Sequence, residues 1–208
     1  MEPSYKAFVH SVNVNIEYLQ LFADRLDTRK LEVSITRAIR YMCEDDRNVF
    51  AMGIGKSAIV ARKFISSLMS VGKKSWYVHP TEAAHGDLGL IKKHDIVFLF
   101  SNGGLTEEIN KLLAELKRRD VMLIAITGYV DSYMGRQCHC TIDIGHTQES
   151  DPLQIIPTTS YTKMSVIGDG LVSGYMVTKN VMLEEYKKSH PGGAIGEKLK
   201  GKENEMDS

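Results

Sequence analysis

The stretch VFAMGIGKSAIVARKFISSLMSVG, residues 49–72, contains an apolar run, a glycine-containing turn and an amphipathic segment in immediate succession. The run at 49–52 is typical of a buried strand. Apolar side chains at mixed spacings of three and four over 58–71 predict a helix. A strand followed by a short turn and a helix is the repeating unit of a parallel α/β sheet. Residues 49–72 therefore predict an α/β fold.

The same alternation continues along the chain. Apolar runs predict further strands over 75–78, 96–100, 121–126 and 141–144, and an amphipathic segment predicts a helix over 106–118. Strands that are apolar throughout are typical of a parallel sheet with helices on both faces. We therefore expect one sheet that is buried on both sides.

Helical spacing also dominates the two ends of the chain. It predicts two opening helices over 5–22 and 31–42, and one long helix over 158–186. We divide the chain into an N-terminal helical extension (1–30), one catalytic or binding domain (31–200) and a polar tail (201–208).

The composition excludes several classes of protein. The 208 residues are 43% hydrophobic, and 26 basic side chains balance 26 acidic ones. Zero net charge disfavours nucleic acid and anionic membranes as partners, and no apolar run approaches the ~20 residues that span a bilayer. The polar N-terminus predicts no secretory signal, and three cysteines without framework spacing suit a reducing compartment. We expect a cytoplasmic protein.

Two segments raise the question of a metal. In CHC, residues 138–140, an extended backbone would place the histidine opposite both cysteines, which favours strand residues over a metal site. The segment HPTEAAHGDLG, residues 79–89, holds two histidines and two carboxylates. It suits either a metal site or a capped short helix with hydrogen-bonded histidines.

Two glycine-containing loops follow predicted strands and precede predicted helices. GIGKS, residues 53–57, offers a flexible backbone, a helix N-terminus and a lysine, which together suit a phosphate, although a plain tight turn is the alternative. Its spacing matches neither a nucleotide P-loop nor a dinucleotide fingerprint. SNGGLT, residues 101–106, adds hydroxyl groups and an amide. Because ligands of parallel α/β sheets bind beyond the carboxyl ends of the strands, both loops predict a metal-free phosphate site.

Six strings together resemble the sugar isomerase (SIS) domain of arabinose-5-phosphate isomerases over residues 30–200. They are GIGKS (53–57), HPTEAAHGDLG (79–89), SNGGLTEEI (101–109), ITG (126–128), PTTS (157–160) and SHPGGAIG (189–196). The resemblance implies a flavodoxin-like three-layer α-β-α sandwich with a five-stranded parallel sheet, assembled as a homotetramer with shared active sites. It implies interconversion of D-arabinose 5-phosphate and D-ribulose 5-phosphate without metal or cofactor. The product would supply 3-deoxy-D-manno-octulosonate (Kdo) for lipopolysaccharide or capsule.

The family pattern points to four catalytic residues. Glu149 would be the base that moves a proton between neighbouring carbons, and His190 would transfer protons at the sugar oxygens. Lys56 would neutralise negative charge, and Glu108 would position a hydroxyl or the lysine. A solvated loop and a helix C-cap are the structural alternatives for Glu149 and His190. Substrate or phosphate binding would fall to Gly55, Ser57, His85, Ser101, Asn102, Gly104, Thr106, Thr158 and Ser160.

The sequence also departs from that pattern. Gly103 and Leu105 stand where the family has serine and glutamate, and Ser150 and Asp151 follow Glu149 where alanine and cysteine are usual. We also expect no regulatory pair of cystathionine-β-synthase (CBS) domains. These departures keep two alternatives open, a phosphohexulose isomerase on the same fold and a sugar-phosphate sensor without catalysis.

Overall fold

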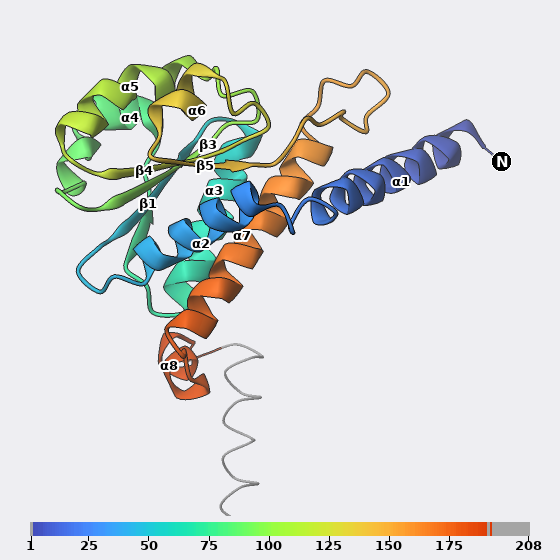
Figure 1. Cartoon of the computed structure of the whole chain (residues 1–208). Coiled ribbons are helices and arrows are strands. Elements are labelled where there is room, and N and C mark those ends of the chain that lie inside the picture. Colours follow the sequence, from blue (N-terminus) through green and yellow to red (C-terminus); the bar gives the residue numbers. More distant parts are fainter. Residues whose placement is uncertain (1, 191, 193–208) are drawn as a thin grey trace, which may run out of the picture.

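The computed structural model describes residues 2–190 and 192, and its centre is a sheet of five parallel strands in the order β2-β1-β3-β4-β5 (Figure 1). The strands are β1 (Val49–Gly53), β2 (Ser75–Tyr77), β3 (Ile96–Phe100), β4 (Met122–Thr127) and β5 (Cys140–Asp143). Each lies within a residue or two of an apolar run in the sequence. The predicted α/β class and the five-stranded parallel sheet are confirmed.

Helices cover both faces of the sheet. They are α1 (Pro3–Ala23), α2 (Arg29–Met42), α3 (Lys56–Ser70), α4 (Pro80–Ala84), the 3₁₀ turn η1 (Asp87–Leu90), α5 (Glu107–Arg118), α6 (Tyr133–Gln137), α7 (Thr159–Thr178) and α8 (Leu183–Ser189). Alternate strand residues point to opposite faces. Val49 and Ala51 pack in the core formed with α2, α3 and α7, whereas Phe50 and Met52 pack in the core formed with α4, α5 and α6. The result is the expected three-layer sandwich.

The strand order reverses between β1 and β3. From β1 the chain continues to β2 on one side, and then returns to β3 on the other side. Gly53 at the end of β1 pairs with Phe100 at the end of β3, so the loops that follow these two strands start side by side. A reversal of this kind is where open α/β sheets bind ligands.

The predicted single helix over 158–186 is wrong at its C-terminal end. Helix α7 ends at Thr178, and α8 begins at Leu183 after a turn in which Asn180 has a φ of 49°. Asparagine tolerates this left-handed conformation better than most residues, and the turn redirects the chain.

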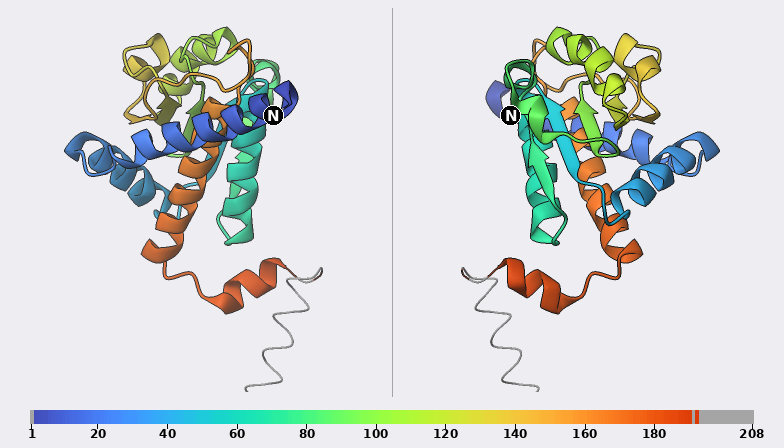
Figure 2. Two further views of the ribbon diagram at one scale, coloured as in Figure 1. Left: turned by 90° about the vertical axis from the view of Figure 1, so that its right-hand side faces the viewer. Right: turned by 90° about the vertical axis from the view of Figure 1, so that its left-hand side faces the viewer.

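Helix α1 extends away from the sandwich and contacts α7 near the N-terminal end of α7 (Figures 1 and 2). The predicted polar tail at 201–208 lies outside the described residues. Among the described residues, no helix is both long and apolar enough to cross a bilayer.

Candidate functional site

The loop after β1 exposes its backbone to solvent at the start of α3. Gly55 precedes α3 with a φ of 58°, a conformation that favours glycine. Lys56 is the first residue of α3, and its side chain is exposed. The Tyr77 hydroxyl donates a hydrogen bond of 2.9 Å to the carbonyl of Gly53, and burial raises the pKa of Tyr77, which keeps the hydroxyl a donor. A lysine therefore stands beside an exposed helix N-terminus.

The loop after β3 is held by its own hydroxyl groups. Ser101 is buried, and its Oγ lies 2.8 Å from Oγ1 of Thr106 and accepts a bond of 3.1 Å from the backbone nitrogen of Gly104. Gly104 has a φ of 64°, and a Cβ there would overlap Oγ of Ser132. Only glycine fits this position. The Oδ1 atom of Asn102 is buried and has no hydrogen-bond partner among the described residues, which leaves one acceptor of this loop unused.

Glu149 lies between β5 and α7, and its carboxylate is fixed at the N-terminal end of α7. Its Oε2 accepts bonds from the backbone nitrogen of Thr158 (2.8 Å), from Oγ1 of Thr158 (3.1 Å) and from the backbone nitrogen of Ser160 (3.2 Å). A negative charge at a helix N-terminus is also stabilised by the helix dipole. Its other oxygen, Oε1, takes part in none of these three bonds.

Thr158 and Ser160, which the sequence predicts as substrate-binding residues, donate hydrogen bonds to Glu149 in this structure. This role was not predicted from the sequence. A threonine-rich start to a predicted helix, nine residues after a glutamate, is a signal that could have suggested it.

Lys56, Glu108 and Glu149 share one edge of the sheet. Helices α3 and α7 run side by side (Figure 2), with an ion pair between Lys63, about two turns from the start of α3, and Asp169, about three turns from the start of α7. Glu108 is the second residue of α5, which follows the loop after β3. The starts of α3, α5 and α7 therefore lie at the carboxyl edge of the sheet, and helix N-termini favour an anion.

His190 does not reach this edge within one chain. Helix α7 has 20 residues, so it spans about 30 Å, and α8 and His190 follow its far end (Figure 1). The His190 ring stacks on Tyr186, with ring centroids 4.0 Å apart, and its Nδ1 lies 2.9 Å from the carbonyl of Tyr186. Of the four predicted catalytic residues, three lie at the carboxyl edge of the sheet and His190 lies at the opposite end.

The histidine-containing segment after β2 forms the capped short helix that was one of the two alternatives. Nδ1 of His79 accepts a bond of 3.3 Å from the backbone nitrogen of Thr81 at the start of α4. His85 is exposed just after the last residue of α4. Within the described part of the chain, no three His, Cys, Asp or Glu residues are placed to hold a metal ion.

The polar residues that follow Glu149 are both bonded within the protein. Ser150 is buried, and its Oγ lies 2.8 Å from Oγ of Ser11 in α1. Asp151 accepts backbone bonds from Leu153, Ile155 and Ile156 in the loop that it begins. These departures from the family pattern shape the surroundings of the glutamate.

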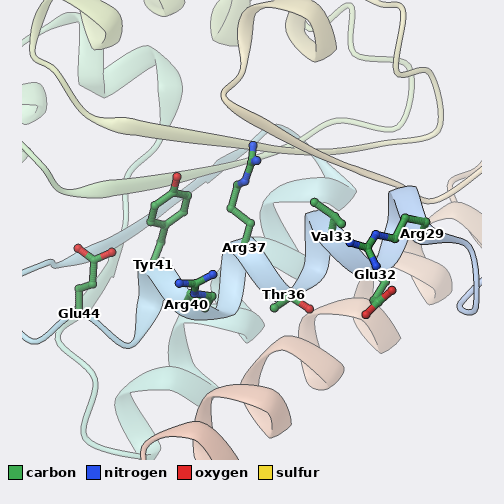
Figure 3. Close-up of a pocket in the computed structure, with 8 residues that line it drawn as sticks. All are labelled: Arg29, Glu32, Val33, Thr36, Arg37, Arg40, Tyr41 and Glu44. Carbon is green, nitrogen blue, oxygen red and sulfur yellow. The ribbon is translucent and has the colours of Figure 1, made fainter.

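Two surface hollows lie away from these side chains. One, of about 630 Å³, lies beyond β4 and β5 and includes Gly103, Leu105 and Gly128. The other, of about 410 Å³, lies along the outer side of α2 (Figure 3). It is lined by Arg29, Glu32, Val33, Thr36, Arg37, Arg40, Tyr41 and Glu44. Neither hollow includes Lys56, Glu108 or Glu149. Lys56 and Glu108 are exposed to solvent, and Glu149 is half-buried.

Comparison with known proteins places this architecture in a family. The family model described as SIS domain matches residues 42–173, which is more than half of the chain. The chain belongs to the SIS domain family. The match includes β1 to β5, both glycine-containing loops, Glu149 and most of α7.

Relatives of this SIS domain protein include curated arabinose 5-phosphate isomerases KdsD. The Pseudomonas aeruginosa protein is 36% identical over 192 residues, which is 92% of this chain and 59% of the relative. The Escherichia coli K12 protein is 42% identical over 151 residues, 73% of this chain and 46% of the relative. The chain thus spans about half the length of these curated relatives.

A solved structure of similar size is that of an E. coli CFT073 protein in complex with arabinose 5-phosphate. It is 30% identical to this chain with a TM-score of 0.80, and the match covers 92% of this chain and 100% of that one.

Proposed function

We propose that this SIS domain protein is an aldose-ketose isomerase that interconverts D-arabinose 5-phosphate and D-ribulose 5-phosphate. The observation that carries the proposal is the full-length likeness to the E. coli CFT073 protein solved with arabinose 5-phosphate. The curated names of the longer relatives support the same substrate. In this proposal the protein works in the cytoplasm and its product enters Kdo synthesis for lipopolysaccharide or capsule.

The proposed reaction transfers one proton between two carbons. After the sugar ring opens, Oε1 of Glu149 removes the proton from C2 of arabinose 5-phosphate, and the electron pair forms an enediolate across C1 and C2. The proton on the carboxyl group exchanges with solvent before Glu149 delivers a proton to C1, while another proton moves from the C2 hydroxyl to the C1 oxygen. A fixed carboxylate that reaches both carbons is what this transfer requires, and three hydrogen bonds to Oε2 fix this one.

The other groups stabilise charge and hold the phosphate. Lys56, exposed at the start of α3, would balance the enediolate or the phosphate, and Glu108 would position a sugar hydroxyl or the lysine. The loop of residues 101–106 and the adjacent helix starts would receive the phosphate. The proposed scheme uses no metal ion and no cofactor.

We further propose that His190 comes from a second copy of the chain in a homotetramer. It follows the far end of α7, a helix that spans about 30 Å from the end that holds Glu149. A stripe on α1 also leaves apolar side chains exposed, with Tyr5 54%, Phe8 65% and Ile16 59% accessible. An apolar helix face that its own chain leaves uncovered suits contact between copies.

Turnover with a panel of phosphosugars tests the proposal. The protein is incubated with arabinose 5-phosphate, ribulose 5-phosphate and a hexulose 6-phosphate, and products are identified by nuclear magnetic resonance. The proposal predicts isomerisation of the two pentose phosphates. Turnover of the hexulose phosphate alone would identify the phosphohexulose isomerase, and binding without turnover of any sugar would identify a sensor. Gly103 and Leu105 are the residues to exchange for serine and glutamate in either case.

A further inference from the structure

Lys163 is a buried lysine that none of the proposed chemistry uses. It lies in the second turn of α7 and is 2% accessible. Its Nζ donates bonds to the carbonyl of Gly145 (3.2 Å), the carbonyl of His146 (3.3 Å) and Oγ1 of Thr147 (3.0 Å). An ammonium group has three donors, so these three acceptors satisfy it completely. All three belong to the segment that leads from β5 to Glu149.

The surroundings of Lys163 destabilise the charged form of its side chain. Burial, and then the nearby Arg25, lower the pKa of Lys163 to about 8, while Asp143 and Glu149 act in the opposite direction. None of the three hydrogen bonds goes to a carboxylate. A methionine or leucine would fill a similar volume without burying a charge. A lysine is therefore useful at this position because its three hydrogen bonds hold residues 145–147 in place.

Helix α1 completes the same network. The ring of Tyr18 lies under the ammonium group, 5.5 Å from Nζ of Lys163 to the ring centroid. One turn earlier along α1, Nδ2 of Asn15 donates a bond of 3.1 Å to Oγ of Ser150, which also contacts Ser11. Lys163 thus fixes residues 145–147 before Glu149, and α1 fixes Ser150 after it.

We propose that Lys163 is a positioning residue for Glu149, and that α1 supports it through Tyr18 and through the contacts of Ser11 and Asn15 with Ser150. The inference rests on the proposed role of Glu149 as the base. Because a misplacement of about 1 Å can reduce a rate 10²-fold, the network matters for turnover more than for substrate binding.

The kinetic test compares two matched lysine substitutions in and next to α7. Lys163→Met keeps an unbranched side chain of similar volume, one atom shorter, but removes its donors and charge. Lys179→Met is the control, because Lys179 caps the other end of α7 and pairs with Asp45 at 2.5 Å, far from Glu149. We expect Lys163→Met to lower kcat about 10²-fold with KM within about twofold of the parent, and Lys179→Met to leave both unchanged. Unchanged kcat in folded Lys163→Met, or an equal loss in both variants, would overturn the proposal.

A second measurement does not depend on activity. The backbone N–H groups of Thr158 and Ser160 donate to Glu149, so hydrogen exchange at these two amides reports the position of the carboxylate. We expect both amides to exchange faster in Lys163→Met than in the parent, while the amides in the middle of α7 stay protected. If the parent isomerises no sugar, the proposed function fails, and this exchange result alone decides whether Lys163 positions Glu149. Unchanged exchange at Thr158 and Ser160 would contradict the positioning role.

Ser150→Ala provides the test if Lys163→Met does not fold. It removes the hydroxyl that contacts Ser11 and Asn15 and leaves the rest of the segment in place. Ser173→Ala is its control, because Ser173 is exposed on α7 and its hydroxyl donates a hydrogen bond within its own helix, to the carbonyl of Asp169. We expect a lower kcat with unchanged KM in Ser150→Ala, and no change in Ser173→Ala. Equal kcat in the two serine variants would overturn the role given to α1.

Discussion

Glu149 and His190 lie at opposite ends of the segment formed by α7 and α8, because Glu149 accepts bonds from backbone groups at the N-terminal end of α7, whereas His190 directly follows α8. Helix α7 alone, with 20 residues, spans about 30 Å, and His190 follows its far end through α8. A site that uses both residues therefore requires two chains.

Mixed oligomers test this requirement. Glu149→Gln and His190→Ala are each expected to be inactive, but the two variants unfolded together and refolded as mixed oligomers should recover activity. With random pairing, about a quarter of the shared sites would combine an intact glutamate from one chain with an intact histidine from its neighbour. Verified mixed oligomers without activity above that of the separate variants would exclude a shared site, and so would an active monomer in sedimentation.

Alanine substitutions at Gly104 and at its neighbour Gly103 should differ sharply in their effect on stability. A Cβ at Gly104 would overlap Ser132, which caps α6 through a bond from the backbone nitrogen of Gly135, and the φ of Gly104 is 64°. We expect Gly104→Ala to lower the free energy of unfolding by about 2–4 kcal/mol. A Cβ at Gly103 would meet nothing within 4 Å, so Gly103→Ala should change stability by less than about 0.5 kcal/mol. Urea unfolding measures both, and equal losses would contradict this description of the loop.

The buried Lys163 predicts a pH dependence of stability with a definite sign. Its pKa is about 8 in the folded protein against an ordinary value of 10.5. Between these two pH values the unfolded chain holds a proton that the folded chain has lost, so the contribution of Lys163 to stability rises with pH. The free energy of unfolding of the parent minus that of Lys163→Met should be constant below pH 8 and increase from pH 8 towards pH 10. A difference that is independent of pH over this range would show that Lys163 titrates normally.

Removal of metal ions should leave turnover unchanged. In the proposed scheme Lys56 supplies the positive charge for the enediolate or phosphate, and His79 is engaged as the cap of α4. Activity is measured before and after exhaustive dialysis against a chelator. Complete loss, restored by one added metal ion, would instead identify a metal site in the segment of residues 79–89.

Much of the fold could be predicted because the signals are local. Each strand is a short apolar run, as in residues 96–100, and each covering helix has helical spacing, as in α5. The break after α7 could not be predicted in the same way. Residues 179–182 contain neither proline nor glycine, and the positive φ of Asn180 only shows that asparagine adopts a conformation that it tolerates.

The candidate site was less predictable because its contacts are long-range. The two glycine-containing loops are visible as motifs, and the sheet order brings them together as expected. The bonds from Lys163 back to residues 145–147, and from Ser11 to Ser150 across 139 positions, depend on how α1 and α7 pack against each other. No local pattern encodes such contacts, and a lysine in an amphipathic helix is ordinarily a solvated residue.

The most direct test of Glu149 as the base of an isomerase is solvent exchange at the substrate carbon. Arabinose 5-phosphate is incubated in D₂O with the parent protein or with Glu149→Gln, and deuterium at C2 is followed by nuclear magnetic resonance. The amide keeps the shape of the side chain but cannot accept the proton, so we predict deuterium incorporation by the parent and a rate about 10²- to 10⁴-fold lower in the variant, with substrate binding retained. Exchange by Glu149→Gln at the parent rate would show that another group removes the proton.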